Sequence, residues 1–287
     1  SANTEKMNIL PMPLGLNYVA AATKNKGHEV KVLDLMFHAD PPLKTRETID
    51  SFRPEVIGVS VRNIDDQSMN ATRFLLDDVK TVVHYCRSLS DAPVVLGGAG
   101  YSIFPEAVLA WLDADMGIQG EGEAAFPQLL ERLERHADPA GLPGLYLKDR
   151  RTSVERSFIR DLKDLDVSGV HCFSSAYDRS LWMPFQTRRG CPMDCSYCST
   201  ATIEGRTIRK RPPEPAIEEL KGFVKAGFKR IHFVDNTFNL PSSYAKEICR
   251  PIIDAGLEID WMAILYPAKI DEELVRLMAA SGCRGVS

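Results

Sequence analysis

The sequence lacks several features that would assign it to a specialised class of protein. Its net charge is −4, so no excess of basic residues favours binding to nucleic acid or an anionic membrane. We find no apolar run long enough to span a bilayer and no secretory signal pattern. The seven cysteines, three of them clustered, fit a reducing cytoplasm better than a disulfide scaffold. What remains is an ordinary globular composition, and 287 residues are enough for two domains with hydrophobic cores.

The first 137 residues alternate between expected strands and expected helices. Hydrophobic pattern and end signals predict strands at 29–35, 55–61, 93–96 and 116–119, and helices at 13–27, 75–86, 105–112 and 124–135. The segment 55–61 has too few polar residues to face water, which is typical of a strand covered on both faces. This alternation predicts a doubly wound, Rossmann-like parallel sheet over residues 1–137.

A second α/β domain is expected from residue 181 onward. Residues 138–180 contain a break rich in proline and glycine, a short strand at 144–148 and a polar irregular stretch, so we interpret them as a linker. The pattern then predicts strands at 184–188, 230–234 and 259–265, and helices at 216–226, 242–255 and 271–281. Strand and helix alternate there without hairpin turns, which predicts the first half of a βα barrel over residues 181–287.

The two ends of the sequence suggest a piece of a longer protein. The chain enters a loop directly after residues 1–3, although a domain of this kind should begin with a buried strand. Residues 285–287 have the pattern of the start of another strand. We therefore expect truncation at both ends, with a cloning remnant at residues 1–3 as an alternative for the first.

Three cysteines lie close together in the second domain. Cys191, Cys195 and Cys198 form a C-x3-C-x2-C motif, with Tyr197 directly before the last cysteine. Three closely spaced thiolates can hold three irons of an iron–sulfur cluster and leave the fourth iron without a protein ligand. Such an open iron is available for chemistry, whereas a full set of protein ligands closes a metal site.

A zinc site and free thiols are the alternatives for these cysteines. Cys172, Cys249 and Cys283 are candidates for a fourth zinc ligand, but none of them belongs to a paired motif of the kind that zinc knuckles contain. Cys86 matches the apolar stripe of the helix at 75–86, so we expect it in the core.

The cysteine motif, with Arg188, Arg189 and Gly190 directly before it, resembles the radical S-adenosylmethionine (radical SAM) enzymes. The resemblance implies that the three cysteines hold a catalytic [4Fe-4S] cluster whose open iron binds SAM. Reductive cleavage of SAM in that family gives a 5′-deoxyadenosyl radical. The resemblance also implies that Tyr197 lies against the adenine end of SAM, and that a one-electron reductant of the flavodoxin or ferredoxin type is a partner.

Further residues of the second domain are implied as SAM contacts. Asp235 and Asn236 follow the strand at 230–234, where polar groups point into the mouth of a barrel. Many radical SAM proteins carry Gly-Gly-Glu there, which this sequence lacks, so Asp235 is the natural acidic substitute. Arg209 could hold the SAM carboxylate with two hydrogen bonds. Alternatively, Asp235 only shapes a turn and Arg209 belongs to a solvated charge run.

Three loops of the first domain are distinctive because each follows an expected strand. Open α/β sheets bind ligands at the loops beyond the carboxyl ends of their strands. The candidate binding residues are Ser60, Arg62, Asn63 and Asp65 in the first loop, Gly97, Gly98, Gly100 and Tyr101 in the second, and Gly120, Glu121, Gly122 and Glu123 in the third. Glycines allow the backbone to approach a large ligand closely, although a tight turn is the alternative for any one loop.

This set of loops, ahead of the cysteine motif, resembles the cobalamin-dependent radical SAM enzymes. The resemblance covers almost the whole chain and implies a cobalamin-binding domain over 1–137 and a partial radical SAM barrel over 181–287. The Asp-x-His-x-x-Gly motif that ligates cobalt in many cobalamin proteins is absent, so the cobalt would lack a histidine ligand from this chain. Dinucleotide binding is the rival, but its Gly-x-Gly-x-x-Gly fingerprint is missing from the first turn.

The resemblance implies a methyltransferase that acts on an unactivated carbon of a small molecule, with cobalamin carrying the methyl group. One alternative is a cobalamin-dependent radical SAM enzyme that catalyses cyclisation or rearrangement without methylation. A second is a cobalamin carrier or sensor that has lost catalysis, which the intact cysteine motif disfavours.

Overall fold

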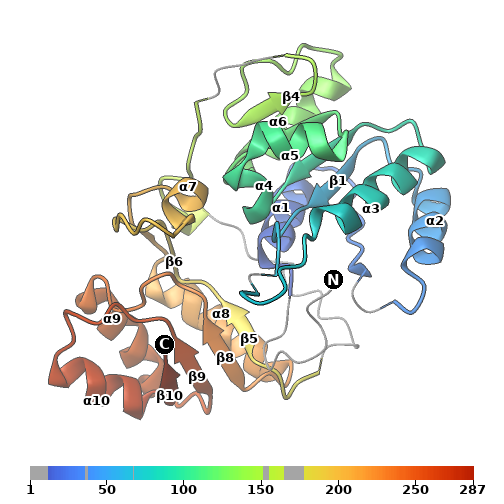
Figure 1. Cartoon of the computed structure of the whole chain (residues 1–287). Helices are drawn as coiled ribbons and strands as arrows, with labels where there is room; N and C mark the ends of the chain where they lie inside the picture. The colour runs from blue at the N-terminus through green and yellow to red at the C-terminus, as the bar shows by residue number, and fades with distance from the viewer. Residues whose placement is uncertain (1–11, 36–37, 67, 151–154, 165–177) are drawn as a thin grey trace. The chain divides into compact units, whose positions relative to one another are not determined.

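The computed structural model describes residues 12–35, 38–66, 68–150, 155–164 and 178–287. They belong to two compact units: the first is mainly residues 15–159 and the second mainly residues 160–287 (Figure 1). Among the described residues, no helix has both the length and the apolar character that crossing a membrane requires.

The first unit is built on a four-stranded sheet with the order β1-β2-β3-β4. These strands are β1 (Ile57–Ser60), β2 (Val94–Gly97), β3 (Met116–Ile118) and β4 (Leu145–Leu147). Strands β1, β2 and β3 are parallel, whereas β4 pairs antiparallel with β3. The three parallel strands confirm the predicted βαβ connections, and β4 is the short strand expected within the linker.

Helices cover both faces of this sheet. They are α1 (Leu14–Asn25), α2 (Pro41–Phe52), α3 (Leu76–Leu89), α4 (Ala99–Ile103), α5 (Pro105–Leu112) and α6 (Gly122–Glu134). Val94 and Leu96 of β2 belong to a core cluster with residues of α3, α4 and α5, while Val95 belongs to a second cluster with residues of α6. Because alternate strand residues point to opposite faces, this division confirms a doubly wound sheet.

Two predictions for the first unit need correction. The strand expected at 29–35 is not formed, because no described segment pairs with these residues and a strand needs a neighbour for its backbone hydrogen bonds. The helix α2 was not predicted, although Asp40 caps it by accepting a hydrogen bond from the Leu43 N–H at 2.9 Å. The linker expected at 138–180 lies partly outside the described residues.

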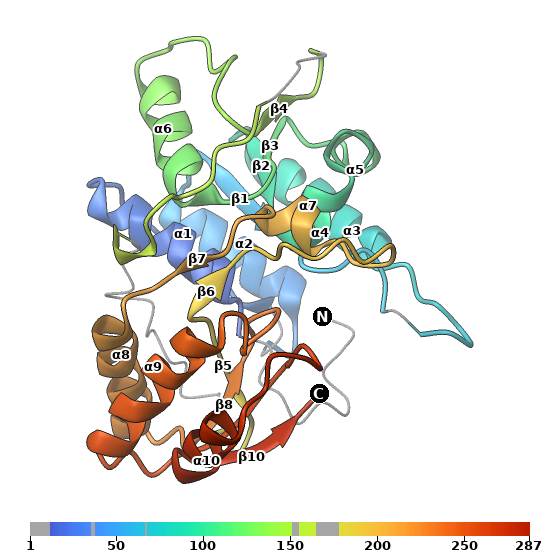
Figure 2. The ribbon, with the colours of Figure 1, turned by 90° about the vertical axis from the view of Figure 1, so that its left-hand side faces the viewer.

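The second unit contains four parallel strands in chain order, as a barrel wall requires. They are β5 (Met183–Phe185), β8 (Arg230–Phe233), β9 (Asp260–Ala263) and β10 (Cys283–Val286). Helices α8 (Pro213–Lys225), α9 (Ser242–Asp254) and α10 (Glu272–Ala280) connect them and follow one another along one side of the sheet (Figure 2). This arrangement confirms the predicted partial βα barrel.

Aromatic side chains fill the space between these strands and helices. Phe185, Phe233 and Trp261 from three adjacent strands pack with Phe223 of α8 and with Phe238, at ring-centroid distances of 5.0 to 5.7 Å. All five are fully buried. This core fixes the carboxyl ends of the strands, from which the candidate site residues follow.

The cysteine motif lies between two short strands that pair with each other. These are β6 (Arg188–Arg189) and β7 (Arg209–Lys210), and their pairing is antiparallel. The short helix α7 (Thr200–Glu204) lies in the same segment, directly after the last cysteine. The β6–β7 pair therefore closes the base of the segment that carries the three thiols.

Candidate functional site

The three cysteines of the motif are free thiols in one loop. Cys191 is buried, whereas Cys195 and Cys198 are exposed. The backbone N–H of Cys198 donates to the carbonyl of Cys195 at 3.1 Å, and that of Cys191 donates to the carbonyl of Gly205 at 3.1 Å. The loop thus has a defined turn between two of its cysteines and is anchored at the third.

The donor set of this loop fits an iron–sulfur cluster better than a single metal ion. Among the described residues, no three His, Cys, Asp or Glu side chains lie close enough together to hold one ion. In a cluster each cysteine binds a different iron, so the three sulfur atoms do not have to meet at one metal ion. Burial raises the pKa of Cys249 to about 11, which disfavours the thiolate that zinc would need. Cys172 lies outside the described residues.

Gly190 shapes the entry to the cysteine loop. Its φ is +85°, and a Cβ atom there would lie 2.1 Å from the carbonyl oxygen of Thr207. A side chain is excluded both by the left-handed backbone and by this contact. The backbone at the entry to the loop therefore explains why a glycine directly precedes the first cysteine.

Asp235 is fully buried and holds the strand that leads into the cysteine loop. Its carboxylate accepts hydrogen bonds from the N–H of Thr187 at 2.7 Å, the hydroxyl of Thr187 at 2.5 Å and the N–H of Arg188 at 3.0 Å. Burial raises the pKa of Asp235, while the guanidinium of Arg188, 3.7 Å away, opposes that rise. These contacts give Asp235 a structural role, and its contact with SAM stays a prediction.

The arginines around the motif are buried. Arg188 and Arg189, which directly precede the first cysteine, are 1% and 5% exposed. The guanidinium of Arg188 donates to the carbonyls of Phe238 and Leu240. Arg209 is 8% exposed, so the solvated charge run given as the alternative for this residue is wrong. Whether Arg209 binds SAM stays a prediction.

Two further candidates of the second unit lie near the thiols in sequence or in space. Tyr197 is 91% exposed, so its ring is not part of the core of the described structure and is accessible to a ligand. Asn236 is half-buried, and its side-chain oxygen accepts a hydrogen bond from the Thr200 hydroxyl at 3.1 Å. Thr200, which the sequence interpretation missed, also lies 3.2 Å from the sulfur of Cys198.

Two of the three loops in the first unit contact each other directly. The N–H of Gly100 donates to the carbonyl of Val61 at 2.9 Å. A Cβ on Gly98 would lie 2.6 Å from that same carbonyl oxygen, and one on Gly100 would lie 3.1 Å from the Arg62 carbonyl. These two glycines are thus explained by contact between loops, whereas a Cβ on Gly97 would have no neighbouring atom closer than 4.0 Å.

Ser102 joins the second loop to the third, and sequence reasoning missed it. Its hydroxyl donates to the carbonyl of Gly98 at 2.8 Å and accepts from the N–H of Gly120 at 2.9 Å. Its own carbonyl accepts from the Gln119 side chain at 2.9 Å. The structure therefore brings all three loops together at the carboxyl edge of the sheet, as the binding hypothesis requires.

The other candidates of the first unit differ in how accessible they are. Ser60, Arg62 and Asn63 are exposed, and Asp65 and Glu123 are half-buried. Tyr101 is fully buried in the core, and a Cβ on Gly117 would lie 2.2 Å from its hydroxyl. Glu121 accepts a hydrogen bond from the N–H of Ile159 at 2.7 Å. Gly122 is the first residue of α6, and a Cβ atom on it would lie 3.0 Å from the side chain of Val19. Tyr101 is therefore a packing residue in this structure.

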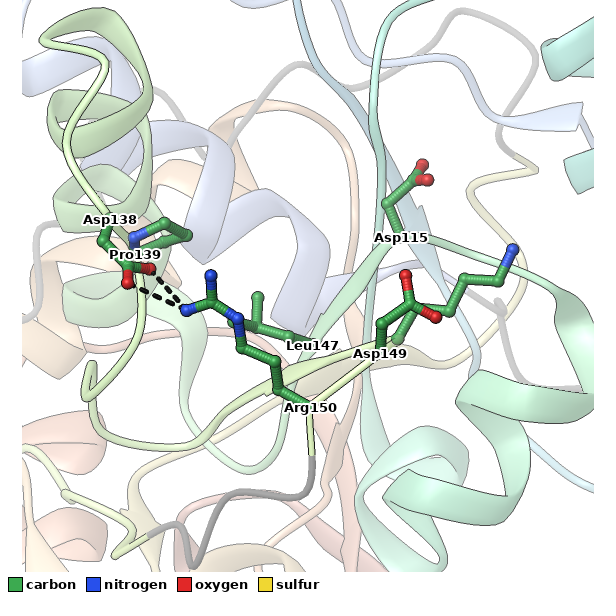
Figure 3. Close-up of a pocket in the computed structure, with 7 residues that line it drawn as sticks. Asp115, Asp138, Pro139, Leu147, Asp149 and Arg150 are labelled. Carbon is green, nitrogen blue, oxygen red and sulfur yellow. Dashed lines mark hydrogen bonds and ion pairs between the residues drawn. The ribbon is translucent and has the colours of Figure 1, made fainter.

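A pocket of the first unit lies at the opposite edge of the sheet (Figure 3). Asp115 directly precedes β3, and residues 147–150 end the antiparallel strand β4 and follow it. Arg150 in this pocket forms an ion pair with Asp138 at 2.8 Å. None of the predicted binding residues lines the pocket, so we do not assign the cofactor to it.

Comparison with known proteins identifies both domains. The model of the B12 binding domain matches residues 6–130, and that of the radical SAM superfamily matches residues 185–287. Among solved structures, the radical SAM methyltransferase TsrM from Kitasatospora setae, with tryptophan and a SAM analogue bound, is similar at a TM-score of 0.83 and 26% identity. That match covers 96% of this chain and 56% of TsrM, which has also been solved with cobalamin and a [4Fe-4S] cluster.

Curated relatives of similar sequence are likewise named as enzymes that transfer methyl groups. The tryptophan 2-C-methyltransferase of Streptomyces laurentii is 27% identical, over 96% of this chain and 56% of the relative. The hopanoid C-3 methylase of Methylococcus capsulatus is 29% identical, over 85% of this chain and 46% of the relative. The chain thus spans about half the length of these relatives.

The two matched regions define a class of protein in which a B12-binding domain precedes a radical SAM domain. The chain belongs to the cobalamin-dependent radical SAM enzymes.

Proposed function

We propose that the protein is a methyltransferase that transfers a methyl group to an unactivated carbon of a small molecule. The observation that carries this proposal is the loop of three free thiols in a barrel unit, preceded in the chain by a doubly wound unit with three converging loops. When bound, a [4Fe-4S] cluster with SAM supplies a 5′-deoxyadenosyl radical, and cobalamin supplies the methyl group. Both curated relatives described above are named for methyl transfer to carbon.

The residues divide between the two cofactor systems. Cys191, Cys195 and Cys198 would hold the cluster, because they are free thiols without a described fourth ligand. Tyr197, Arg209, Asp235 and Asn236 remain the proposed SAM contacts, of which Tyr197 is the most accessible.

The proposed cobalamin site lies at the carboxyl edge of the first sheet. Its exposed members are Ser60, Arg62 and Asn63, and Gly97 is the candidate glycine beside which a Cβ atom would meet no other atom closer than 4.0 Å. We propose the corresponding division of the chain into a cobalamin domain at 1–137, a linker at 138–180 and a radical SAM domain at 181–287.

The partners follow from the chemistry. Reductive cleavage of SAM needs one electron, so a flavodoxin or ferredoxin is the proposed reductant. We propose a cytoplasmic location, which six described cysteines as free thiols would suit. The net charge of −4 gives no support for a nucleic-acid partner.

Anaerobic reconstitution with iron, sulfide and hydroxocobalamin tests the proposal. Wild type is expected to bind about four irons and one cobalt per chain. A variant with Cys191, Cys195 and Cys198 all changed to Ala is expected to lose the iron and keep the cobalt. Cys283→Ala, which removes a thiol of the same unit outside the motif, is the matched control and should keep both metals.

The other outcomes separate the alternatives. Iron without cobalt would leave a radical SAM enzyme whose first domain has another role. Cobalt without iron would favour the carrier or sensor hypothesis and exclude catalysis by a cluster. With both metals bound, mass analysis of products formed from methyl-labelled SAM distinguishes methylation from cyclisation or rearrangement.

A further inference from the structure

A short chain of polar contacts connects one thiol of the motif to the end of a barrel strand. The sulfur of Cys198 lies 3.2 Å from the hydroxyl oxygen of Thr200. That hydroxyl lies 3.1 Å from the side-chain oxygen of Asn236, which follows β8. Thr200 is the first residue of α7, so the contact joins the end of the cysteine loop to the barrel.

Adjacent residues therefore hold both ends of the cysteine loop. Asp235 accepts hydrogen bonds from Thr187 and Arg188, which lead into the loop. Asn236 contacts Thr200, where the loop ends. Because Asp235 is fully buried and fixed by three hydrogen bonds, the backbone that carries Asn236 is fixed as well. The Thr200 hydroxyl is thus held in place from the barrel side.

The direction of these hydrogen bonds depends on the state of the sulfur. With a free thiol, Cys198 donates to the Thr200 hydroxyl, which in turn donates to Asn236. A thiolate bound to iron has no proton, so it can only accept. The hydroxyl then donates to sulfur, and a half-turn of the Asn236 amide presents its NH₂ group as donor to the hydroxyl oxygen.

We propose that Thr200, oriented by Asn236, donates a hydrogen bond to the Cys198 thiolate of the bound cluster and raises the reduction potential of that cluster. Reduction adds one negative charge to the cluster, and a donor to a ligand sulfur stabilises that charge. Hydrogen bonds to the sulfurs are one of the factors that set the potential of such clusters. Thr200 is thus a positioning and tuning residue rather than a ligand, and this inference rests on the proposed function, since it needs a cluster.

Substitutions at Thr200 separate the hydroxyl from the shape of the side chain. Thr200→Val keeps the branched shape and removes the donor, whereas Thr200→Ser keeps the donor. Asn236→Ala removes the group that orients the hydroxyl. Ser199→Ala is the matched control, because the side chain of Ser199 makes no capping hydrogen bond at the start of α7.

The measurement is a reductive titration of the reconstituted protein followed by electron paramagnetic resonance, without SAM, so that an effect through SAM binding is excluded. Thr200→Val is expected to shift the equilibrium toward the oxidised cluster on the order of tenfold, which is about 59 mV for one electron. Asn236→Ala should shift it in the same direction by less, while Thr200→Ser and Ser199→Ala should match wild type.

The results also distinguish this inference from the proposed function. Iron-free wild-type protein would overturn both. A full complement of iron in every variant, with equal potentials in wild type and Thr200→Val, would overturn the role of Thr200 and leave the proposed function intact. A shift of equal size in Thr200→Ser would also overturn it, because the hydroxyl would then not be the cause.

Discussion

Asp235 joins two strands of the barrel unit that are far apart in the sequence. An acidic residue after the second barrel strand fits a SAM contact, and nothing in the local sequence indicates another partner. In the structure its carboxylate accepts from groups at positions 187 and 188, almost fifty residues earlier. Such long-range pairing follows from the parallel packing of β5 and β8 and has no signature in the sequence around residue 235.

Asp235→Asn tests whether this residue is structural or a SAM contact. The amide keeps the size but carries no charge and places an NH₂ group among the N–H and O–H donors, so Arg188 loses its buried counter-charge. Breaking a buried ion pair costs about 3–5 kcal/mol of unfolding free energy. Denaturant unfolding should show a loss of that size, and calorimetric titration of the folded protein with SAM reports the affinity.

Asp260→Asn is the matched control for that experiment. Asp260 pairs with Arg284 at 2.7 Å, but the two side chains are 45% and 62% exposed, so the loss of this ion pair should cost about 0–1 kcal/mol. If Asp235→Asn unfolds like wild type yet loses SAM affinity, the structural role is wrong and the SAM contact is supported.

At the scale of elements, the sequence predicted most strands and helices but not how they are joined. A glycine lies at or directly after the end of the predicted helices 13–27, 216–226 and 271–281, and these glycines (Gly27, Gly227 and Gly282) have φ values between +91° and +99°. Helix ends are local, so local residues specify them. The solvated charge run offered as the alternative for Arg209 was wrong because a run of charged residues does not by itself report burial. Its neighbour Arg211 pairs with Glu219 of α8 at 2.5 Å, and both side chains are buried.

The cofactor loops of the first unit were predicted as three separate segments, whereas the structure joins them through Ser102. In Ser102→Ala the N–H of Gly120 and the carbonyl of Gly98 lose their partner. An unpaired polar group of this kind costs about 1–3 kcal/mol of stability. We also expect weaker binding of hydroxocobalamin, because the third loop is no longer held against the second.

Denaturant unfolding and an absorbance titration with hydroxocobalamin measure these two effects. Ser88→Ala is the matched control, since the exposed Ser88 hydroxyl donates only to the carbonyl of Tyr85 at 2.7 Å and should matter by about 0.5 kcal/mol or less. Unchanged cobalamin affinity in Ser102→Ala, with the expected loss of stability, would show that the three loops do not act together in binding.

At the scale of the whole molecule, each unit has its own hydrophobic core. Two clusters enclose the first sheet from its two faces, and the aromatic cluster fills the second unit between strands and helices. The separate cores explain why alternation of strands and helices was enough to predict two α/β domains. The hydrophobic pattern of a helix or strand indicates which of its faces is buried, but it contains little information about the substrate.

Separate cores also predict that unfolding occurs in two steps. Multi-domain proteins commonly depart from two-state behaviour, so calorimetry of the protein without cofactors should resolve two transitions. A ligand stabilises the unit that binds it, by about 2.7 kcal/mol at a concentration of 100 times its Kd. Hydroxocobalamin should therefore raise the temperature of one transition, and reconstitution of the cluster should raise that of the other. A single transition that both additions shift equally would mean that the two cores unfold together, and the cofactors would then be coupled through the stability of the whole chain.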